Sequence, residues 1–142
     1  MKHLLATLLL VVASTANATN WQLVSDSDSN DIRLLVDVDT VLIDKYDKHN
    51  TGKKTDYRVS STMTYISDNS EVNFLVIIDA DDCLRKGAGA LASRTAGETE
   101  SKISFWSSQG QTMRDAQGQW MCGYLKGTLE VTQPKPKEKS YL

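Results

Sequence analysis

The chain has 142 residues, of which 40% are hydrophobic, 7% aromatic and 24% charged. That length suits one domain with a real core and is short for two. The 16 basic and 18 acidic residues give a formal net charge of −2. Binding to nucleic acid needs a basic face that neutralises phosphates, so this charge balance argues against a nucleic-acid partner.

The first residues have the pattern of a secretory signal peptide. Lys2 precedes an apolar run over residues 4–12, and a small-residue stretch then ends in Ala-x-Ala at Ala18. Signal peptidase is expected to cut between Ala18 and Thr19. The apolar run is far shorter than the ~20 residues of a membrane-spanning helix, and no other segment is apolar enough to span. We therefore expect residues 1–18 to be removed and the protein to be periplasmic or secreted. A buried N-terminal helix is the alternative.

Two cysteines, Cys83 and Cys122, follow this leader. An even number of cysteines in an oxidising compartment indicates a disulfide bond. Closing a loop of this length contributes about 4 kcal/mol in the chain-entropy model. A metal site is the alternative, but two isolated thiols lack the other two ligands that zinc requires. A lipid anchor would need a cysteine directly after the apolar run, where none stands. We expect neither a lipid anchor nor a cofactor.

Short alternating runs separated by polar turns predict one antiparallel, β-sheet-rich α+β domain over residues 19–132, closed by the disulfide. The expected strands, in chain order, are residues 21–24, 32–38, 57–65, 72–78, 103–107 and 120–125, with 41–43 as a short apolar piece. The expected turns and loops are residues 26–31, 44–56, 67–70 and 116–119. The unbroken apolar run at 74–78 predicts a central strand. Residues 87–92 favour a strand or bend over a helix, because each interior glycine costs a helix about 1 kcal/mol. Residues 133–142 have little to bury and are predicted to be disordered.

Catalytic residues are scarce. His49 is the only histidine after the leader, and it lies in the charged loop at 44–56. A histidine-dependent triad or dyad therefore has a single candidate, with no apolar pocket around it. Residues 52–55 resemble a phosphate-binding loop, but Asp47 and Lys54 stand where that motif needs a glycine and a hydroxyl residue. We predict that the protein is not an enzyme.

Four residues match the first, third, fifth and twelfth places of a calcium-binding loop: Asp26, Asp28, Asn30 and Asp37. Asp31, however, stands where the loop needs a glycine, and the twelfth residue is Asp instead of the usual Glu. An acidic turn explains the same residues, so we predict no metal and leave calcium as the open alternative for this segment. A second acidic cluster, formed by Asp79, Asp81 and Asp82, is interpreted as a solvated strand end.

The aromatic residues are the better candidates for function. Phe105 and Trp106 are neighbours on one expected strand, so one must face the core while the other lies under a helix or in solvent. Trp120 and Tyr124 recur at strand spacing. The simplest interpretation is that these rings fill a small core. The alternative is a recognition site on an open sheet face, with candidate ligand-binding residues Trp106, Trp120 and Arg85, helped by Arg94 or Lys102.

Several landmarks stand in a characteristic order: Trp21, the Asp-bearing strand at 35–40, the Asp82-Cys83 pair with Arg85 shortly after, and late Trp120 and Cys122. This order resembles the surface-adhesin protein E family of small exported bacterial proteins, over most of residues 20–125. The resemblance implies an antiparallel sheet backed by a helix, and a surface or periplasmic protein without enzymatic activity whose relatives bind host matrix proteins. Two departures, the missing lipobox cysteine and the closeness of the second cysteine to the tryptophan, leave anchoring and bridge geometry open.

These observations together predict an exported, non-enzymatic, adhesin-like binding protein that recognises a protein or glycan outside the cytoplasm. The alternative is a periplasmic inhibitor or assembly factor that docks on another bacterial protein.

Overall fold

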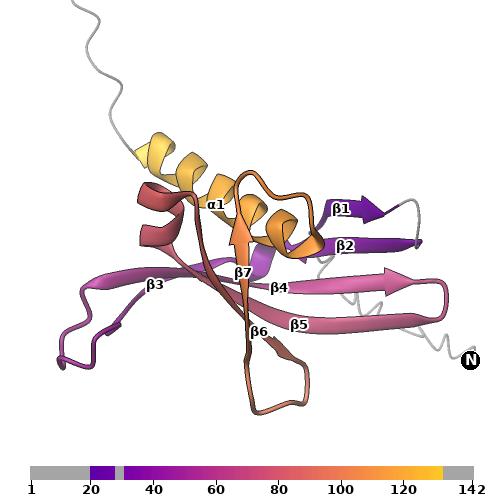
Figure 1. The fold of residues 1–142 in the computed structure, drawn as a ribbon, viewed down its shortest axis with the longest axis horizontal. Coiled ribbons are helices and arrows are strands. Elements are labelled where there is room, and N and C mark those ends of the chain that lie inside the picture. Colours follow the sequence, from indigo (N-terminus) through magenta and orange to yellow (C-terminus); the bar gives the residue numbers. More distant parts are fainter. Residues whose placement is uncertain (1–19, 28–30, 133–142) are drawn as a thin grey trace, which may run out of the picture.

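The computed structural model describes residues 20–27 and 31–132 (Figure 1). These residues form a seven-stranded antiparallel sheet and one long helix. The strands are β1 (Trp21–Ser27), β2 (Ile32–Asp37), β3 (Leu42–Tyr46), β4 (Asp56–Ser67), β5 (Ser70–Asp79), β6 (Ala88–Thr95) and β7 (Lys102–Ser107). The helix is α1 (Met113–Thr132), and the two short helical turns are η1 (Val38–Thr40) and η2 (Asp82–Lys86). The predicted α+β, sheet-rich class is confirmed. The expected leader and tail lie outside the described residues.

The strands follow the order β1-β2-β4-β5-β6-β7, and β3 pairs with β4 off this path. β4 has 12 residues, enough to pair with β2 through residues 63–66 and with β3 through residues 56–60. β5 lies between β4 and β6, which confirms the predicted central strand. β1 and β7 are the two ends of the main path, so β7 is an edge strand of the sheet.

One face of the sheet is covered by α1, and we call it the inner face. Its buried apolar side chains are Leu34, Val36, Val59, Met63, Phe74, Val76, Ile78, Leu91 and Trp106. From α1, Met121 and Leu125 join this core. Fully burying an aliphatic or aromatic side chain contributes about 1.5–3 kcal/mol, so this layer is the main source of stability. Figure 1 shows α1 along one side of the sheet, with β7 running steeply across the direction of β4 and β5.

The contact between β7 and α1 depends on one glycine. Gly118 of α1 lies directly against the indole of Trp106, and a Cβ at this position would overlap the ring. Trp106 is 2% exposed, whereas its neighbour Phe105 is 76% exposed on the opposite, outer face. The prediction that these two rings point to opposite faces is confirmed.

The disulfide joins Cys83 in η2 to Cys122 in α1, with 5.3 Å between their Cα atoms. It fastens α1 to the chain segment that follows β5, and both cysteines are buried. The predicted pairing is confirmed.

The expected turn at 116–119 and strand at 120–125 are wrong, because both segments belong to α1. The helix begins with a reciprocal cap: the Asp115 carboxylate accepts the Thr112 amide at 2.9 Å, and the Thr112 hydroxyl oxygen accepts the Asp115 amide at 3.2 Å. Such a Ser/Thr-x-x-acid pattern satisfies backbone donors at a helix start. Trp120 and Tyr124 are thus one helical turn apart, and their rings stack with centroids 5.6 Å apart.

Candidate binding surface

The outer face of β5, β6 and β7 carries a shallow groove of about 340 Å³. Its floor is formed by Ile77, Ala90, Ala92 and Ile103. These residues share one face, because Ile77 pairs with Ala92 and Ala92 pairs with Ile103 in the sheet register. The two alanines reach less far from the sheet than their neighbours, so the surface is hollowed between the larger side chains.

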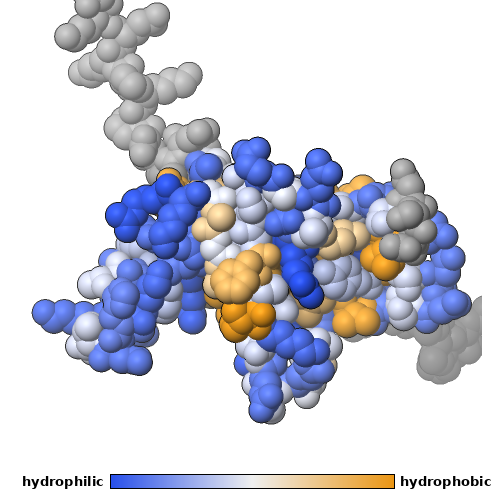
Figure 2. Space-filling model, in the orientation of Figure 1, coloured by the Kyte–Doolittle hydropathy of each residue, from blue (hydrophilic) through white to orange (hydrophobic). Residues whose placement is uncertain are grey.

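The β7 side of this groove is apolar and open to solvent. Figure 2 shows an apolar patch over β7 on a face that is otherwise mostly polar. Ile103 is 63% exposed and Phe105 is 76% exposed. A single exposed apolar side chain is ordinary, but two adjacent ones beside a groove are typical of an interaction surface. The strip formed by Ile103 and Phe105 is called the β7 strip below.

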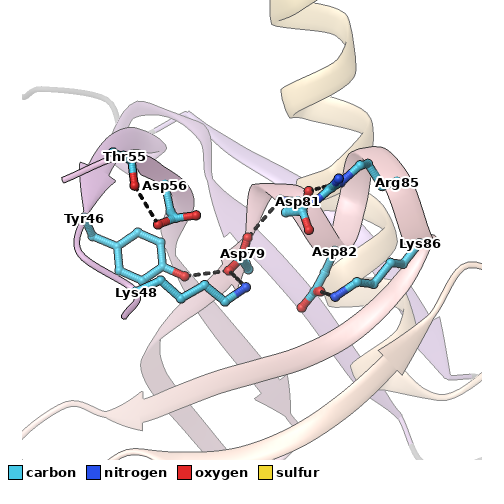
Figure 3. Close-up of polar contacts among 9 residues, drawn as sticks. All are labelled: Tyr46, Lys48, Thr55, Asp56, Asp79, Asp81, Asp82, Arg85 and Lys86. Atoms are coloured by element: carbon cyan, nitrogen blue, oxygen red, sulfur yellow. Dashed lines mark hydrogen bonds and ion pairs between the residues drawn. The ribbon is translucent and has the colours of Figure 1, made fainter. Parts of the chain in front are cut away.

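The opposite end of the groove is polar (Figure 3). Tyr46 ends β3 and Asp79 ends β5, and both stand next to Lys48. The Tyr46 hydroxyl donates to the Asp79 carboxylate at 2.5 Å, and the Lys48 ammonium lies 2.5 Å from the same oxygen. Beside them, Arg58 forms a two-pronged ion pair with Asp44, with N–O distances from 3.0 to 3.2 Å. A group of opposite charge therefore pairs with each of these four residues, Lys48, Asp79, Arg58 and Asp44.

These contacts shift the proton affinities of the groups involved. Burial raises the pKa of Asp79, but the hydrogen bonds from Lys48 and Tyr46 outweigh it and hold the pKa below its ordinary value. Burial and the hydrogen bond to Asp79 raise the pKa of Tyr46 well above its ordinary value. At neutral pH the pair is therefore a carboxylate and a neutral phenol joined by a hydrogen bond.

Asp79→Asn should consequently lower stability at neutral pH and lose its effect in acid. The folded-state pKa is depressed, so the carboxylate contributes stability above the unfolded pKa of about 3.9. That contribution disappears as the pH falls through the lower folded-state value. Urea unfolding from pH 7 to pH 2 measures this contribution. The difference in the free energy of unfolding between wild type and Asp79→Asn should narrow steadily as the pH falls. Asp39→Asn, at an exposed position in η1, is the matched control. A difference that is constant with pH would contradict the prediction.

The other two residues of the acidic cluster, Asp81 and Asp82, also have cationic partners. Asp81, directly before η2, pairs with Arg85, and Asp82 pairs with Lys86 at 2.8 Å; the residues of each pair are four positions apart. The Asp82 carboxylate lies against Gly89 of β6, where no side chain could be accommodated. The acidic cluster is therefore an ion-paired junction between β5, η2 and β6 and not a freely solvated strand end.

The candidate site residues do not come together in one place. Trp106 is buried between β7 and α1, which corrects the alternative that it is a recognition anchor on an open face. Trp120 is half-buried on α1, and Arg85 is exposed but held by Asp81. For Trp120 and Arg85, ligand binding stays a prediction.

The remaining predicted candidates lie elsewhere. His49 is exposed in the loop between β3 and β4. Of the calcium-loop residues, Asp28 and Asn30 lie outside the described residues, and Asp26 and Asp37 are in β1 and β2. Within residues 20–27 and 31–132, no group of three or more His, Cys, Asp or Glu side chains is placed to hold a metal ion. In the same part of the chain, no helix is both long and apolar enough to cross a membrane.

No protein-family model, curated protein or solved structure matches this chain. Its likeness to the surface-adhesin protein E family therefore stays a prediction from the landmarks quoted above. The class that the structure defines is a disulfide-closed antiparallel sheet with one helix on its inner face and a partly apolar, solvent-exposed outer face.

Proposed function

We propose that this chain is an exported, non-enzymatic binding protein, adhesin-like in recognising a protein or glycan outside the cytoplasm through the outer face of its sheet. The observation that carries the proposal is the β7 strip, because two large apolar side chains remain exposed beside a groove with an apolar floor. Interfaces concentrate their binding energy in a few residues, and aromatic side chains such as Phe105 are enriched at interfaces.

Three further observations support the proposed compartment and the proposed lack of catalysis. A disulfide such as Cys83–Cys122 persists in oxidising compartments, which is consistent with the export signal in the sequence. His49, the one histidine of the described range, lies exposed in a loop. The Asp79 carboxylate is held by the Tyr46 hydroxyl and the Lys48 ammonium, as in a structural contact.

The test is a binding panel with the purified, oxidised protein. The probes are purified extracellular-matrix proteins, a glycan array and periplasmic extract. Wild type should bind at least one probe, and Ile103→Ser with Phe105→Ser should weaken that binding by about tenfold or more. Leu23→Ser, a 55%-exposed leucine on β1 at the other end of the sheet, is the matched control and should bind like wild type.

Three outcomes separate the possibilities. Binding to matrix proteins or glycans that depends on the β7 strip supports the proposal. A stoichiometric complex found only in periplasmic extract supports the inhibitor or assembly-factor alternative instead. Failure of wild type to bind any probe, or equal losses in the two variants, contradicts an outer-face binding role.

A further inference from the structure

The backbone of β7 leaves hydrogen-bonding groups unpaired at its free edge. In an antiparallel pair, successive residues point their N–H and C=O groups alternately toward the partner strand and away from it. The Ser108 amide donates to the Gly87 carbonyl at 2.8 Å, which fixes the direction for the strand. Trp106 and Ser104 therefore face β6, whereas Ser107, Phe105 and Ile103 point their backbone groups outward.

Side chains of α1 close one end of this edge. The outward Ser107 amide donates to the Asp115 carboxylate at 2.7 Å, and the Ser107 carbonyl accepts from the Gln119 amide at 2.9 Å. These bonds confirm the alternation. They also show that side chains of α1 form hydrogen bonds with the outward backbone groups of Ser107. The same groups of Ile103 and Phe105 receive no such contact within the described part of the chain. They are the section of the edge that an added strand can reach.

The side chains of β7 on the outer face of the sheet differ from those on its inner face. Ile103 and Phe105 extend from the outer face, whereas Lys102 belongs to the inner face with Ser104 and Trp106. Near Phe105, a hollow of about 490 Å³ is lined by Tyr65, Met113 and Arg114, among others. Arg114 is close enough to Tyr65 for its charge to oppose the rise in the pKa of Tyr65 that burial causes.

Lys102 and Arg114 differ from the cations at the other end of the groove. Lys48, Arg58, Arg85 and Lys86 each have an aspartate partner. Lys102 and Arg114 are exposed, and among residues 20–27 and 31–132 neither has an acidic side chain within ion-pair distance. The open edge therefore has an apolar outer side. Its inner side has two cations without an ion-pair partner, beside the Asp115 carboxylate that the Ser107 and Thr112 amides hold.

We propose that the β7 edge binds an extended segment of a partner polypeptide as an added antiparallel strand, whose apolar side chains pack on Ile103 and Phe105 and whose alternating acidic side chains face Lys102 and Arg114. This inference rests on the proposed binding function and narrows its ligand to a polypeptide. Strand addition takes affinity from main-chain hydrogen bonds and specificity from alternate side chains. An acidic strand fits better than a second copy of this chain, because self-pairing would bring two sets of the same cations together.

The probe is a short synthetic peptide of alternating glutamate and valine. In the proposed register the valines lie opposite Ile103 and Phe105, so their amides point at β7 and the glutamate amides point away. N-methylation of the valines should therefore abolish binding, whereas N-methylation of the glutamates should change affinity less than about threefold, which corresponds to less than one hydrogen bond. A lysine–valine peptide should bind at least about tenfold more weakly than the glutamate–valine peptide.

Amide hydrogen exchange locates the binding. In the free protein the Ser104 and Trp106 amides should be protected, and those of Ile103 and Phe105 should exchange quickly. The peptide should protect the latter two. Ile103→Pro removes one outward donor at a position where an edge strand tolerates proline, and Ile103→Ala is its control with the donor retained. The proline variant should lose more affinity than the alanine variant.

Each contrary result has a distinct meaning. No saturable peptide binding, binding without protection of the two amides, or equal effects of the two N-methylated series would overturn strand addition. Concentration-dependent protection in the free protein would show that a second copy occupies the edge, which also overturns it. If the binding panel still depends on the β7 strip while Ile103→Pro binds like Ile103→Ala, the proposed function stands and only the strand-addition inference fails.

Discussion

Removing the disulfide with Cys83→Ser and Cys122→Ser should lower the free energy of unfolding by about 4 kcal/mol in the chain-entropy model. The bridge joins residues that are 39 apart in the sequence, so its loss restores considerable freedom to the unfolded chain. A small domain has only about 5–15 kcal/mol of stability in total, so the change is large. Urea unfolding of the oxidised protein and the double variant, at the same pH and temperature, measures it.

The reductant provides the control for this experiment. Reduction of wild type should reproduce the instability of the double variant, and the same reductant should leave the double variant unchanged. Hydrogen exchange should show the largest local loss of protection in α1, because the bridge is its covalent link to η2. A loss of stability below about 1 kcal/mol would mean that packing of α1 alone holds the helix on the sheet.

The strands were predictable because their burial alternates. Ile32–Asp37 and Asp56–Ser67 alternate more buried with less buried residues over most of their length, and most of their apolar residues follow this period of two in the sequence. The central strand was predictable for another reason. Its alternate residues Leu75 and Ile77 are half-buried on the outer face, which leaves the run apolar on both sides.

The helix was not predictable from periodicity. Trp120, Cys122 and Tyr124 recur every second residue and so resemble a strand, although Trp120 and Tyr124 are also one helical turn apart. Glycines at 118, 123 and 127 lower helix propensity. Gly118 is explained only by the tertiary contact with Trp106, which the sequence does not reveal. The Thr112-x-x-Asp115 cap was the available signal for the helix.

The candidate site, like the fold, was predictable from the sequence only in part. The sequence places Phe105 and Trp106 on opposite faces but does not say which faces the core; the pairing of Trp106 with Gly89 and its contact with α1 decide that. The hydrogen bond between Tyr46 and Asp79 joins residues 33 positions apart, and no local pattern announces such a pair. Apolar residues on both faces of 103–107 were the signal for the β7 strip, because a strand with only one covered face must expose the other set.

The neighbouring residues Phe105 and Trp106 should respond to mutation in opposite ways. Trp106→Ala should lower the free energy of unfolding by about 3–5 kcal/mol, because it empties the space between β7 and α1. Phe105→Ala should change it by no more than about 0.5 kcal/mol, as is usual for an exposed position. Binding through the β7 strip should show the reverse: Phe105→Ala weakens it, while Trp106→Ala reduces it only in proportion to the unfolded fraction.

Trp106→Phe is the second variant, for use if Trp106→Ala does not fold. It keeps an aromatic ring at this position but removes the polar indole N–H. The indole Nε1 is buried and has no hydrogen-bond partner among the described residues, so replacing it removes an unsatisfied donor as well as ring volume. The loss of stability should therefore be smaller than for Trp106→Ala, with ligand affinity of the folded protein unchanged. Urea unfolding and calorimetric titration with a ligand from the binding panel measure the two quantities. If Phe105→Ala destabilised the protein as much as Trp106→Ala, the outward placement of Phe105 would be wrong, and with it the apolar surface on which binding through β7 depends.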